Sequence, residues 1–141
     1  MYEMSRDETR AFLLEGTRTA KLATTRKDGR AHVAPIWFLL DGDDLVFTTH
    51  ETSVKGNSVR REPRVSLCVD DEEPPFAYVI IEGTVSIDRD LGRLRDWATR
   101  IGGRYMGADR ADEYGARNGV EGELLVRVTP TKVLAHGAIA D

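Results

Sequence analysis

The sequence is poor in cysteine and has no long apolar run. A single cysteine, Cys68, stands among 141 residues, so neither an intramolecular disulfide nor a multi-cysteine metal site can form, which is typical of a reducing cytoplasm. No stretch approaches the roughly 18 apolar residues of a membrane-spanning helix. The first residues are polar and acidic, without the apolar segment of a secretory signal. We therefore expect a cytoplasmic protein that is not embedded in a membrane.

Positive charge and aromatic residues are also scarce. The chain has 20 Lys and Arg against 24 Asp and Glu, a formal net charge of −4, whereas proteins that bind duplex nucleic acid carry an excess of positive charge. Aromatic residues make up 7% of the chain, and a barrel that binds single strands would interleave them with basic residues along a groove. We expect no nucleic-acid partner, and any phosphate site must be local.

The length and the apolar content indicate one domain. With 40% hydrophobic residues, the chain can form one compact core, but it is too short for two. No repeat, low-complexity tract or linker divides it. We predict a single domain over residues 1–141.

Strands are predicted where apolar residues alternate with polar ones, or where an apolar run lies between two turn signals. The pair Asp28-Gly29 separates two such runs, which is a strong hairpin signal. Gly83 inside a predicted strand indicates a β-bulge or a close backbone approach. Pro130 is expected to interrupt the last strand. The predicted strands cover residues 19–25, 31–40, 45–49, 64–70, 78–87, 123–128 and 132–136.

Three short helices are predicted beside these strands. Ser5 and Glu8 have the spacing of a capping box at a helix start. The segment 53–62 lacks strand alternation and ends before a proline. Apolar residues from Leu91 to Tyr105 recur at helical spacing, which predicts a helix on the sheet that the glycines 102 and 103 weaken at its end. A further turn of helix is predicted around residues 111–117.

The order of these elements favours a mainly β, α+β fold. All strand connections except the last are short, and the turn signals are those of hairpins rather than of βαβ units. The first three strands are expected to pair in succession as a meander. The prediction is an antiparallel sheet of at least six strands, closed into a barrel, with a few short helices.

The segment from Phe47 to Arg61 runs from a strand into a short helix. It combines hydroxyl side chains, the N–H groups of a helix start, and Lys and Arg side chains one or two turns apart. A helix N-terminus carries unpaired donors and partial positive charge, which suit a phosphate. The same composition is common on a solvated helix face, so these residues alone leave both interpretations open.

A second candidate is the segment Val33–Phe38, which has a proline inside a predicted strand. Pro35 removes one ladder N–H and marks an edge or a bulge, and Trp37 and Phe38 place large apolar side chains on opposite faces. A flat ring system fits against such a strand. Barrel core and a subunit contact explain the same residues.

The sequence gives no signal for catalysis by the protein's own nucleophile or by a metal. His32, His50 and His136 have no metal-type spacing with one another or with other ligands. No Gly-x-Ser-x-Gly motif is present. Nothing beside Cys68 in the sequence would lower its pKa, so we expect a small strand residue rather than a nucleophile. We therefore expect no metal site.

Taken together, these segments resemble the pyridoxamine 5′-phosphate oxidase-like superfamily of split β-barrel flavoproteins, and within it the flavin/deazaflavin oxidoreductases. The resemblance is carried by the order and the spacing of several segments rather than by one motif. These segments are residues 20–25, 28–38, 41–43, 45–49, 55–64 and 78–85.

The resemblance implies a split-barrel homodimer with the cofactor in a groove between two barrels, contacted by both chains. It places the cofactor phosphate at the basic segment and the tricyclic ring beside the proline-containing strand. The residues implied at the phosphate end are Thr48, Thr49, Ser53, Val54, Lys55 and Arg60, and those beside the ring are Pro35, Ile36 and Trp37.

The resemblance also implies an activity: hydride transfer between bound coenzyme F420 and a small unsaturated acceptor, such as an enone, an imine or a tetrapyrrole. FMN is the alternative cofactor, because both carry a phosphate after a ribityl chain. Such a cofactor supplies the reactive carbon, so no protein nucleophile is needed. Solvent or a side chain near the 106–122 loop would act as general acid, with Arg104 and Tyr105 as candidates. The competing interpretation is a non-enzymatic protein that binds flavin, F420 or haem.

Overall fold

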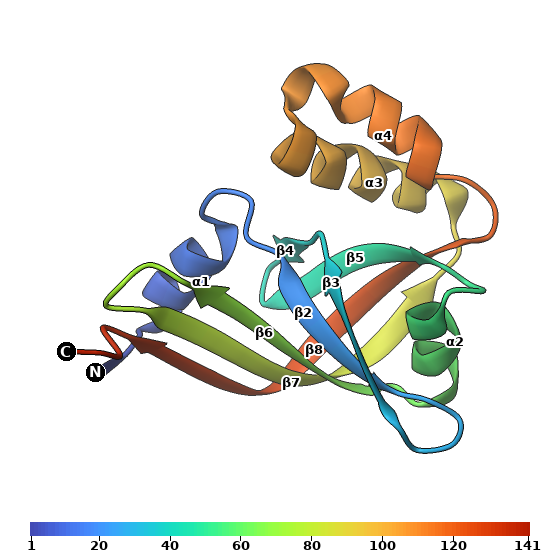
Figure 1. Ribbon diagram of the computed structural model, residues 1–141. Coiled ribbons are helices and arrows are strands. Elements are labelled where there is room, and N and C mark those ends of the chain that lie inside the picture. Colours follow the sequence, from blue (N-terminus) through green and yellow to red (C-terminus); the bar gives the residue numbers. More distant parts are fainter.

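Eight strands and four α-helices follow one another in the computed structural model, which describes residues 1–141 (Figure 1). The strands are β1 (Tyr2–Glu3), β2 (Ala20–Thr25), β3 (Ala31–Ile36), β4 (Leu39–Asp41), β5 (Asp44–His50), β6 (Arg64–Asp71), β7 (Ala77–Asp88) and β8 (Glu123–Gly137). The helices are α1 (Arg6–Leu14), α2 (Val54–Arg61), α3 (Leu91–Met106) and α4 (Ala111–Asn118), and a 3₁₀ turn at Ala108–Arg110 precedes α4.

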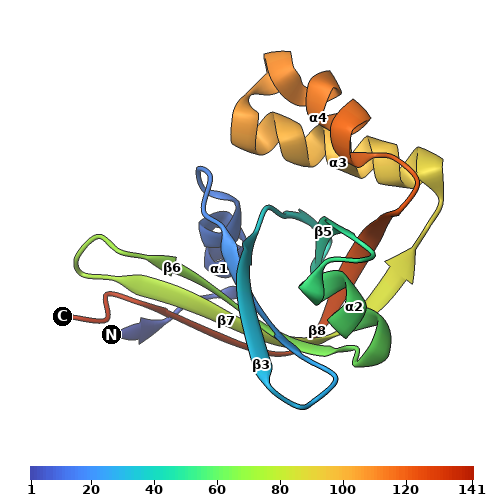
Figure 2. The same cartoon turned by 45° about the vertical axis from the view of Figure 1, so that its right-hand side comes forward.

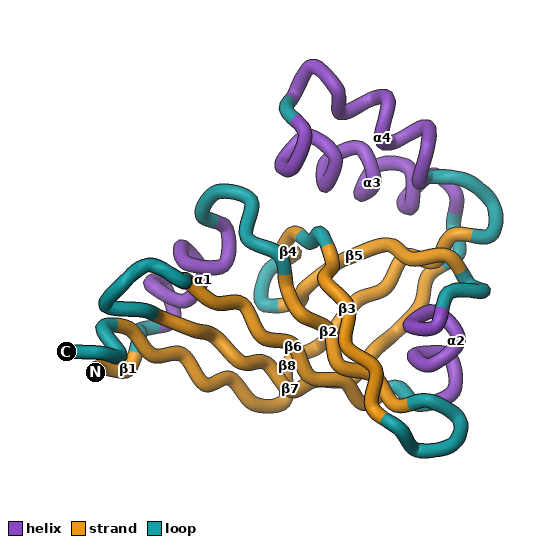
Figure 3. The backbone as a smooth tube through the Cα atoms, in the orientation of Figure 1, coloured by secondary structure: helices purple, strands orange, loops and turns teal.

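All the strands pair antiparallel in one curled sheet, in the order β3-β2-β6-β7-β8-β5-β4, with β1 added to β8. Figures 2 and 3 show how the sheet curls round on itself, and β3 and β4 are the two ends of the strand order and do not pair with each other. The sheet therefore forms a barrel that is split between β3 on one edge and β4 on the other. This confirms the predicted mainly β, antiparallel split barrel.

The predicted meander of three strands is wrong in one respect. The apolar run 31–40 is not one strand, because β3 ends at Ile36 and β4 begins at Leu39. Between them Phe38 turns into the core, where it is fully buried, and its backbone N–H and C=O are bound by side chains of α3. As a result β5 pairs with β4 and β8, and not with β3.

The core lies inside the barrel and is built from the alternation that the sequence predicted. Val65, Leu67 and Val69 of β6 all point inward, and α1, capped by Ser5, contributes Leu13. A second, smaller cluster lies on the outer side of β5 and β8, where α3 packs. It consists of Val46, Leu94, Trp97 and Leu125. The α3–α4 hairpin consequently stands outside the barrel next to β5 (Figure 1).

Gly83 lies at a β-bulge, as predicted. The register between β7 and β8 shifts between Glu82 and Gly83, and a Cβ atom at Gly83 would lie 2.6 Å from the carbonyl oxygen of Thr129. Pro130 is opposite Gly83 at this irregular position, where a ladder N–H can be dispensed with. The expected interruption of the last strand is therefore wrong, because β8 passes through the proline as one strand.

The glycines of α3 pack against a neighbouring helix instead of weakening its end. The helix continues to Met106, and Gly102 is buried against the Tyr114 side chain of α4. The predicted helical turn at 111–117 is α4. None of the helices is both long and apolar enough to cross a membrane.

Candidate functional site

The start of α2 is built by a chain of hydroxyl and backbone contacts that begins on β5. The Ser53 hydroxyl caps the helix: it accepts a hydrogen bond from the Gly56 N–H (3.0 Å) and donates to the His50 carbonyl (2.8 Å). The Thr49 hydroxyl, which is buried, lies 2.9 Å from that of Ser53. The N–H groups of Val54 and Lys55 have no acceptor within the chain. The helix therefore begins with two free donors next to a fixed pair of hydroxyls.

Lys55 is the only cation of α2 without a partner. Arg60 donates to the Glu51 carbonyl (2.9 Å) and to the Asn57 side chain (2.6 Å), and Arg61 donates to the Thr25 carbonyl (3.1 Å). Lys55 is half-buried and makes no hydrogen bond or ion pair. Its ammonium is thus available to an anion at the start of the helix, where the helix dipole also favours negative charge.

The predicted phosphate residues are only partly brought together. Thr49, Ser53, Val54 and Lys55 form one locus at the junction of β5 and α2. Thr48 lies on the opposite face of β5, across from Leu125, whose side chain belongs to the cluster under α3. Arg60 lies on the last turn of α2 with its guanidinium bound to the loop before the helix.

Pro35 and Ile36 lie on β3, at the free edge of the split barrel. The Ile36 side chain is buried in the core, whereas Pro35 is exposed on the outer face opposite Lys21. Because β3 pairs with β2 alone, its other edge offers unpaired backbone groups. Helix α2 contacts both β3 and β5, so the Lys55 locus lies on a helix that packs against the edge strand β3.

Trp37 follows directly on β3 and belongs to an aromatic cluster. Its indole ring stacks on the ring of Tyr105, with centroids 5.0 Å apart and planes at 3°, and lies 5.6 Å from the ring of Tyr114. These contacts join the end of β3 to both helices of the α3–α4 hairpin.

Arg104 and Tyr105 are engaged in holding the fold together. Arg104 donates to the carbonyl oxygens of Leu13, Gly16 and Phe38. The Tyr105 hydroxyl donates to the Arg18 carbonyl (2.8 Å) and accepts from the Phe38 N–H (3.2 Å). Burial raises the pKa of the Tyr105 hydroxyl. The Tyr105 hydroxyl proton and three of the five N–H protons of Arg104 are thus used within the fold.

Glu123 is a neighbour of the site that sequence reasoning missed. It is the first residue of β8 and lies directly opposite His50, the last residue of β5. Burial raises the pKa of the Glu123 carboxyl above its usual value, while the charges of His50 and Lys55 act to lower it. No motif marks this residue in the sequence, since only the pairing of β5 with β8 brings it here.

Other groups with chemical potential lie away from the locus. Cys68 is on the outer face of the sheet, and burial, with the charge of Asp70, raises its pKa, which makes it a poor nucleophile. His, Cys, Asp and Glu side chains form no group of three or more suited to a metal ion.

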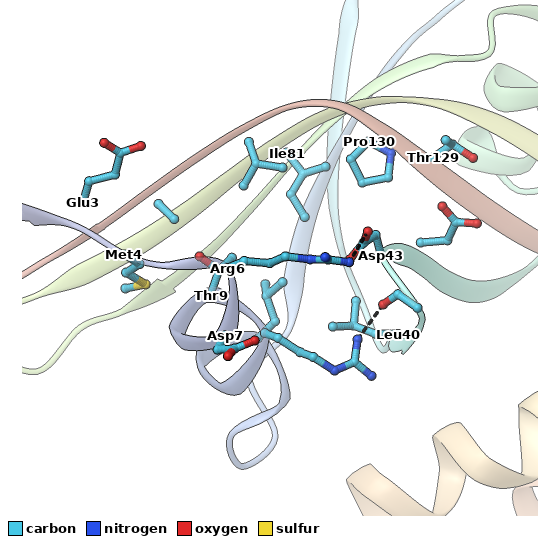
Figure 4. A pocket seen from close by; sticks show the side chains of 16 residues that line it. Glu3, Met4, Arg6, Asp7, Thr9, Leu40, Asp43, Ile81, Thr129 and Pro130 are labelled. Carbon is cyan, nitrogen blue, oxygen red and sulfur yellow. Dashed lines mark hydrogen bonds and ion pairs between the residues drawn. The ribbon is translucent and has the colours of Figure 1, made fainter.

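Four of the cavities on the chain have volumes of about 440 to 780 Å³, and neither Ser53 nor Lys55 lines any of these four. The most spacious lies between α1, the β4–β5 turn and the inner face of β7 and β8 (Figure 4). Arg6 crosses it to bind Asp43 (2.6 Å), and Arg10 donates to the Gly42 carbonyl (2.5 Å). None of the nine predicted cofactor residues lines this cavity. The Lys55 locus thus lies outside these four cavities.

Similar solved structures share this architecture. The conserved hypothetical protein Rv2991 from Mycobacterium tuberculosis superposes with a TM-score of 0.85 at 24% identity, over 96% of this chain and 86% of that one. A structure named F420 Reductase has 29% identity and a TM-score of 0.68, over 87% and 94% of the two chains. A putative pyridoxamine 5′-phosphate oxidase from Listeria innocua has 22% identity and a TM-score of 0.70, over 92% and 95%.

The sequence of the chain agrees with this structural likeness. The family described as pyridoxamine 5′-phosphate oxidase matches residues 5–137, which is nearly the whole of the split barrel and includes the α3–α4 hairpin. The chain therefore belongs to the pyridoxamine 5′-phosphate oxidase family.

Proposed function

We propose that the chain is a cytoplasmic, homodimeric oxidoreductase that transfers a hydride between bound coenzyme F420 and a small unsaturated organic acceptor. The observation that carries the proposal is the free Lys55 ammonium beside two free N–H groups at the start of α2. This locus lies on a helix that contacts both β3 and β5. A phosphate at the start of α2 and a flat ring along β3 would place one cofactor across these elements.

The phosphate end of the site follows from the local chemistry. Lys55 supplies a charge, the N–H groups of Val54 and Lys55 supply donors, and the capped start of the helix keeps them in place. Charge-assisted hydrogen bonds of this kind are stronger than neutral ones. Arg60 contributes positive charge, and its Nη2 atom donates to the Glu51 carbonyl and the Asn57 side chain.

The choice of F420 rests on the solved structure named F420 Reductase, which is 29% identical to this chain. FMN is the alternative cofactor. Both carry a phosphate after a ribityl chain, so the Lys55 locus serves either one.

A second copy of the chain is proposed to complete the site. The outer face of the sheet β3-β2-β6-β7-β8 carries apolar side chains among polar ones, which include Lys21, Ser66, Glu82 and Lys132. Its exposed and half-buried apolar side chains, identified by the strand register, are Val33, Pro35, Ala23, Cys68, Ile80 and Leu134. Val33 is 63% exposed and Leu134 39%, and apolar patches of this kind mark interfaces. Because Pro35 belongs to this face, a partner seated on it would lie against the ring end of the site.

The chain's own residues would bind and orient the cofactor. When bound, F420 supplies the carbon that accepts or donates the hydride, and no protein nucleophile is needed. The free edge of β3 would offer backbone donors to the ring carbonyls, which stabilises charge that develops there. Arg104 and Tyr105 are occupied by the fold, so the proposal assigns the proton to solvent. Enones, imines and tetrapyrroles are the acceptor classes to test.

Parallel titration of the protein with F420 and with FMN tests the proposal, followed by a screen of the three acceptor classes with the reduced form of the cofactor that binds. We expect F420 to bind more tightly and at least one acceptor to be reduced. Binding of F420 without turnover of any acceptor would favour a non-enzymatic carrier instead. Failure to bind either cofactor would overturn the proposal.

A further inference from the structure

Glu123 places a negative charge beside a site that is proposed to bind an anion. Directly opposed residues of antiparallel strands share one face of the sheet, so the side chains of His50 and Glu123 lie on the same side of the β5–β8 pair. The next pair along the two strands, Thr49 and Leu124, has both side chains buried on the opposite face of the sheet. His50 and Glu123 therefore stand together on the outer face, where β5 runs into the loop before α2.

The loops around these two residues are tightly connected. A Cβ atom at Gly122 would lie 3.0 Å from the Nε2 atom of His50, so the backbone before Glu123 lies close to the imidazole. The Gly122 carbonyl accepts a hydrogen bond from the Glu51 N–H (2.9 Å), and the Thr52 N–H donates to the His50 Nδ1 (3.1 Å). The start of β8 is thus fixed against the loop that leads into α2.

We propose that the Glu123 carboxyl group makes the Lys55 phosphate site sensitive to pH, because binding of the cofactor phosphate is linked to the uptake of a proton by this group. This inference rests on the function proposed above. An ionised Glu123 opposes a second negative charge at Lys55, whereas a protonated Glu123 does not.

The charges around Glu123 support this assignment. His50 from β5 and Lys55 from α2 are the two cations that act on its carboxyl, and neither forms an ion pair with it. The effect of burial on the pKa of Glu123 is larger than the opposing effects of these two charges, so the pKa is raised. Of the other charged groups nearby, Glu51 is neutralised by Arg89 (2.6 Å), and Glu121 is exposed. No charge from β7 or α3 has a resolved effect on Glu123.

The direction of the linkage follows from these charges. A bound phosphate adds negative charge near the carboxyl and raises its pKa further, so a proton is taken up on binding. At high pH the ionised carboxylate weakens binding. Two like charges a few ångströms apart near a protein surface repel each other strongly enough to change affinity on the order of 10-fold.

The test compares cofactor dissociation constants of the wild type and Glu123→Gln between pH 5.5 and pH 8.5, with F420 and FMN as probes. We expect the variant to bind on the order of 10-fold more tightly than the wild type at pH 8.5, and the ratio of the two dissociation constants to approach one as the pH falls. Because both proteins bind the same phosphate, the ionisation of the phosphate affects both constants equally and cancels in their ratio. A ratio of dissociation constants that does not change with pH would overturn the inference.

Two matched variants complete the experiment. Glu121→Gln, an exposed neighbour, should show the wild-type pH dependence. His50→Gln separates the contribution of the neighbouring imidazole: the pH dependence attributed to Glu123 should persist in this variant, and its loss would overturn the inference. Calorimetric titration of the wild type in two buffers of different ionisation enthalpy measures proton uptake without any variant, and absence of uptake would also overturn the inference. Loss of cofactor binding by the wild type would instead overturn the proposed function.

Discussion

The indole ring of Trp37 stacks face to face on the phenol ring of Tyr105, with centroids 5.0 Å apart. The hydroxyl of the same Tyr105 bonds to the backbone of Phe38 and of Arg18. One side chain of α3 therefore fixes both the break between β3 and β4 and the approach to β2. This contact sets the geometry of the free edge of β3.

Removing the Tyr105 hydroxyl should destabilise the fold. The change Tyr105→Phe leaves the Phe38 N–H and the Arg18 carbonyl without their partner, which typically costs about 1 to 3 kcal/mol. Urea unfolding measures the loss. Tyr2→Phe is the control, because the Tyr2 hydroxyl bonds to Glu8 in an exposed place, and its effect should stay within about 0.5 kcal/mol. Equal effects of the two changes would contradict the role given to Tyr105.

Loss of the Lys55 ammonium should weaken cofactor binding. The change Lys55→Ala removes a charge-assisted contact to phosphate, which we expect to cost about 1 to 3 kcal/mol of binding free energy. Equilibrium titration with F420 and FMN measures it. Lys27, exposed in the β2–β3 turn, provides the control Lys27→Ala, which should bind like the wild type. Unchanged affinity of the Lys55 variant would remove this residue from the site.

The Ser53 hydroxyl should matter for stability as the cap of α2. Ser53→Ala loses the bond to the Gly56 N–H, and the loss of an N-cap costs about 0.5 to 2 kcal/mol. Thermal unfolding of Ser53→Ala is compared with that of Ser86→Ala, an exposed serine of β7. If both variants unfold like the wild type, the cap does not hold the start of α2.

A charge on the outer sheet face should disrupt the proposed dimer. Leu134→Glu places a carboxylate in the row formed by Pro35, Cys68 and Ile80, where burial against a partner would leave it unpaired. Light scattering after size exclusion should show the wild type as a dimer at micromolar concentration and the variant as a monomer. Val120→Glu, an exposed position in the loop before β8, should remain dimeric. A monomeric wild type would refute the shared site.

The raised pKa of Glu123 predicts a pH-dependent stability. Burial raises this pKa in the folded chain above its value of 4.5 in the unfolded chain. Below the pKa of the unfolded chain, Glu123 is protonated in both the folded and the unfolded chain and does not affect the free energy of unfolding. As the pH rises through the pKa of the folded chain, the buried carboxyl ionises, and this lowers the stability of the fold. Glu123→Gln should therefore raise the melting temperature by about 1 to 3 °C at pH 7 and leave it unchanged at pH 4. A variant less stable than the wild type at pH 7 would contradict this.

Alternation and turn residues were sufficient to predict most of the sheet. The strict pattern of β6 identified its buried residues, and Gly83 marked the bulge, because both signals are local. The break at Trp37 and Phe38 was missed, since it depends on contacts with α3 more than sixty residues later. The same is true of Pro130, which β8 tolerates only because Gly83 lies opposite.

The candidate site shows the same division between local and distant signals. Ser53, Val54 and Lys55 are adjacent in sequence, and their clustering at a helix start was predictable. Glu123 reaches His50 only through the pairing of β5 with β8, which no local signal in the sequence indicates. Strand register is therefore what the sequence alone could not supply.

A crystal structure of the protein with bound F420 tests the central claim most directly. The account predicts the cofactor phosphate within hydrogen-bonding distance of the Lys55 ammonium and the N–H groups at the start of α2. The ring would lie along β3 against a second copy of the chain. A phosphate bound elsewhere, for example under α1 beside Arg6 and Arg10, with Lys55 in open solvent, would contradict it.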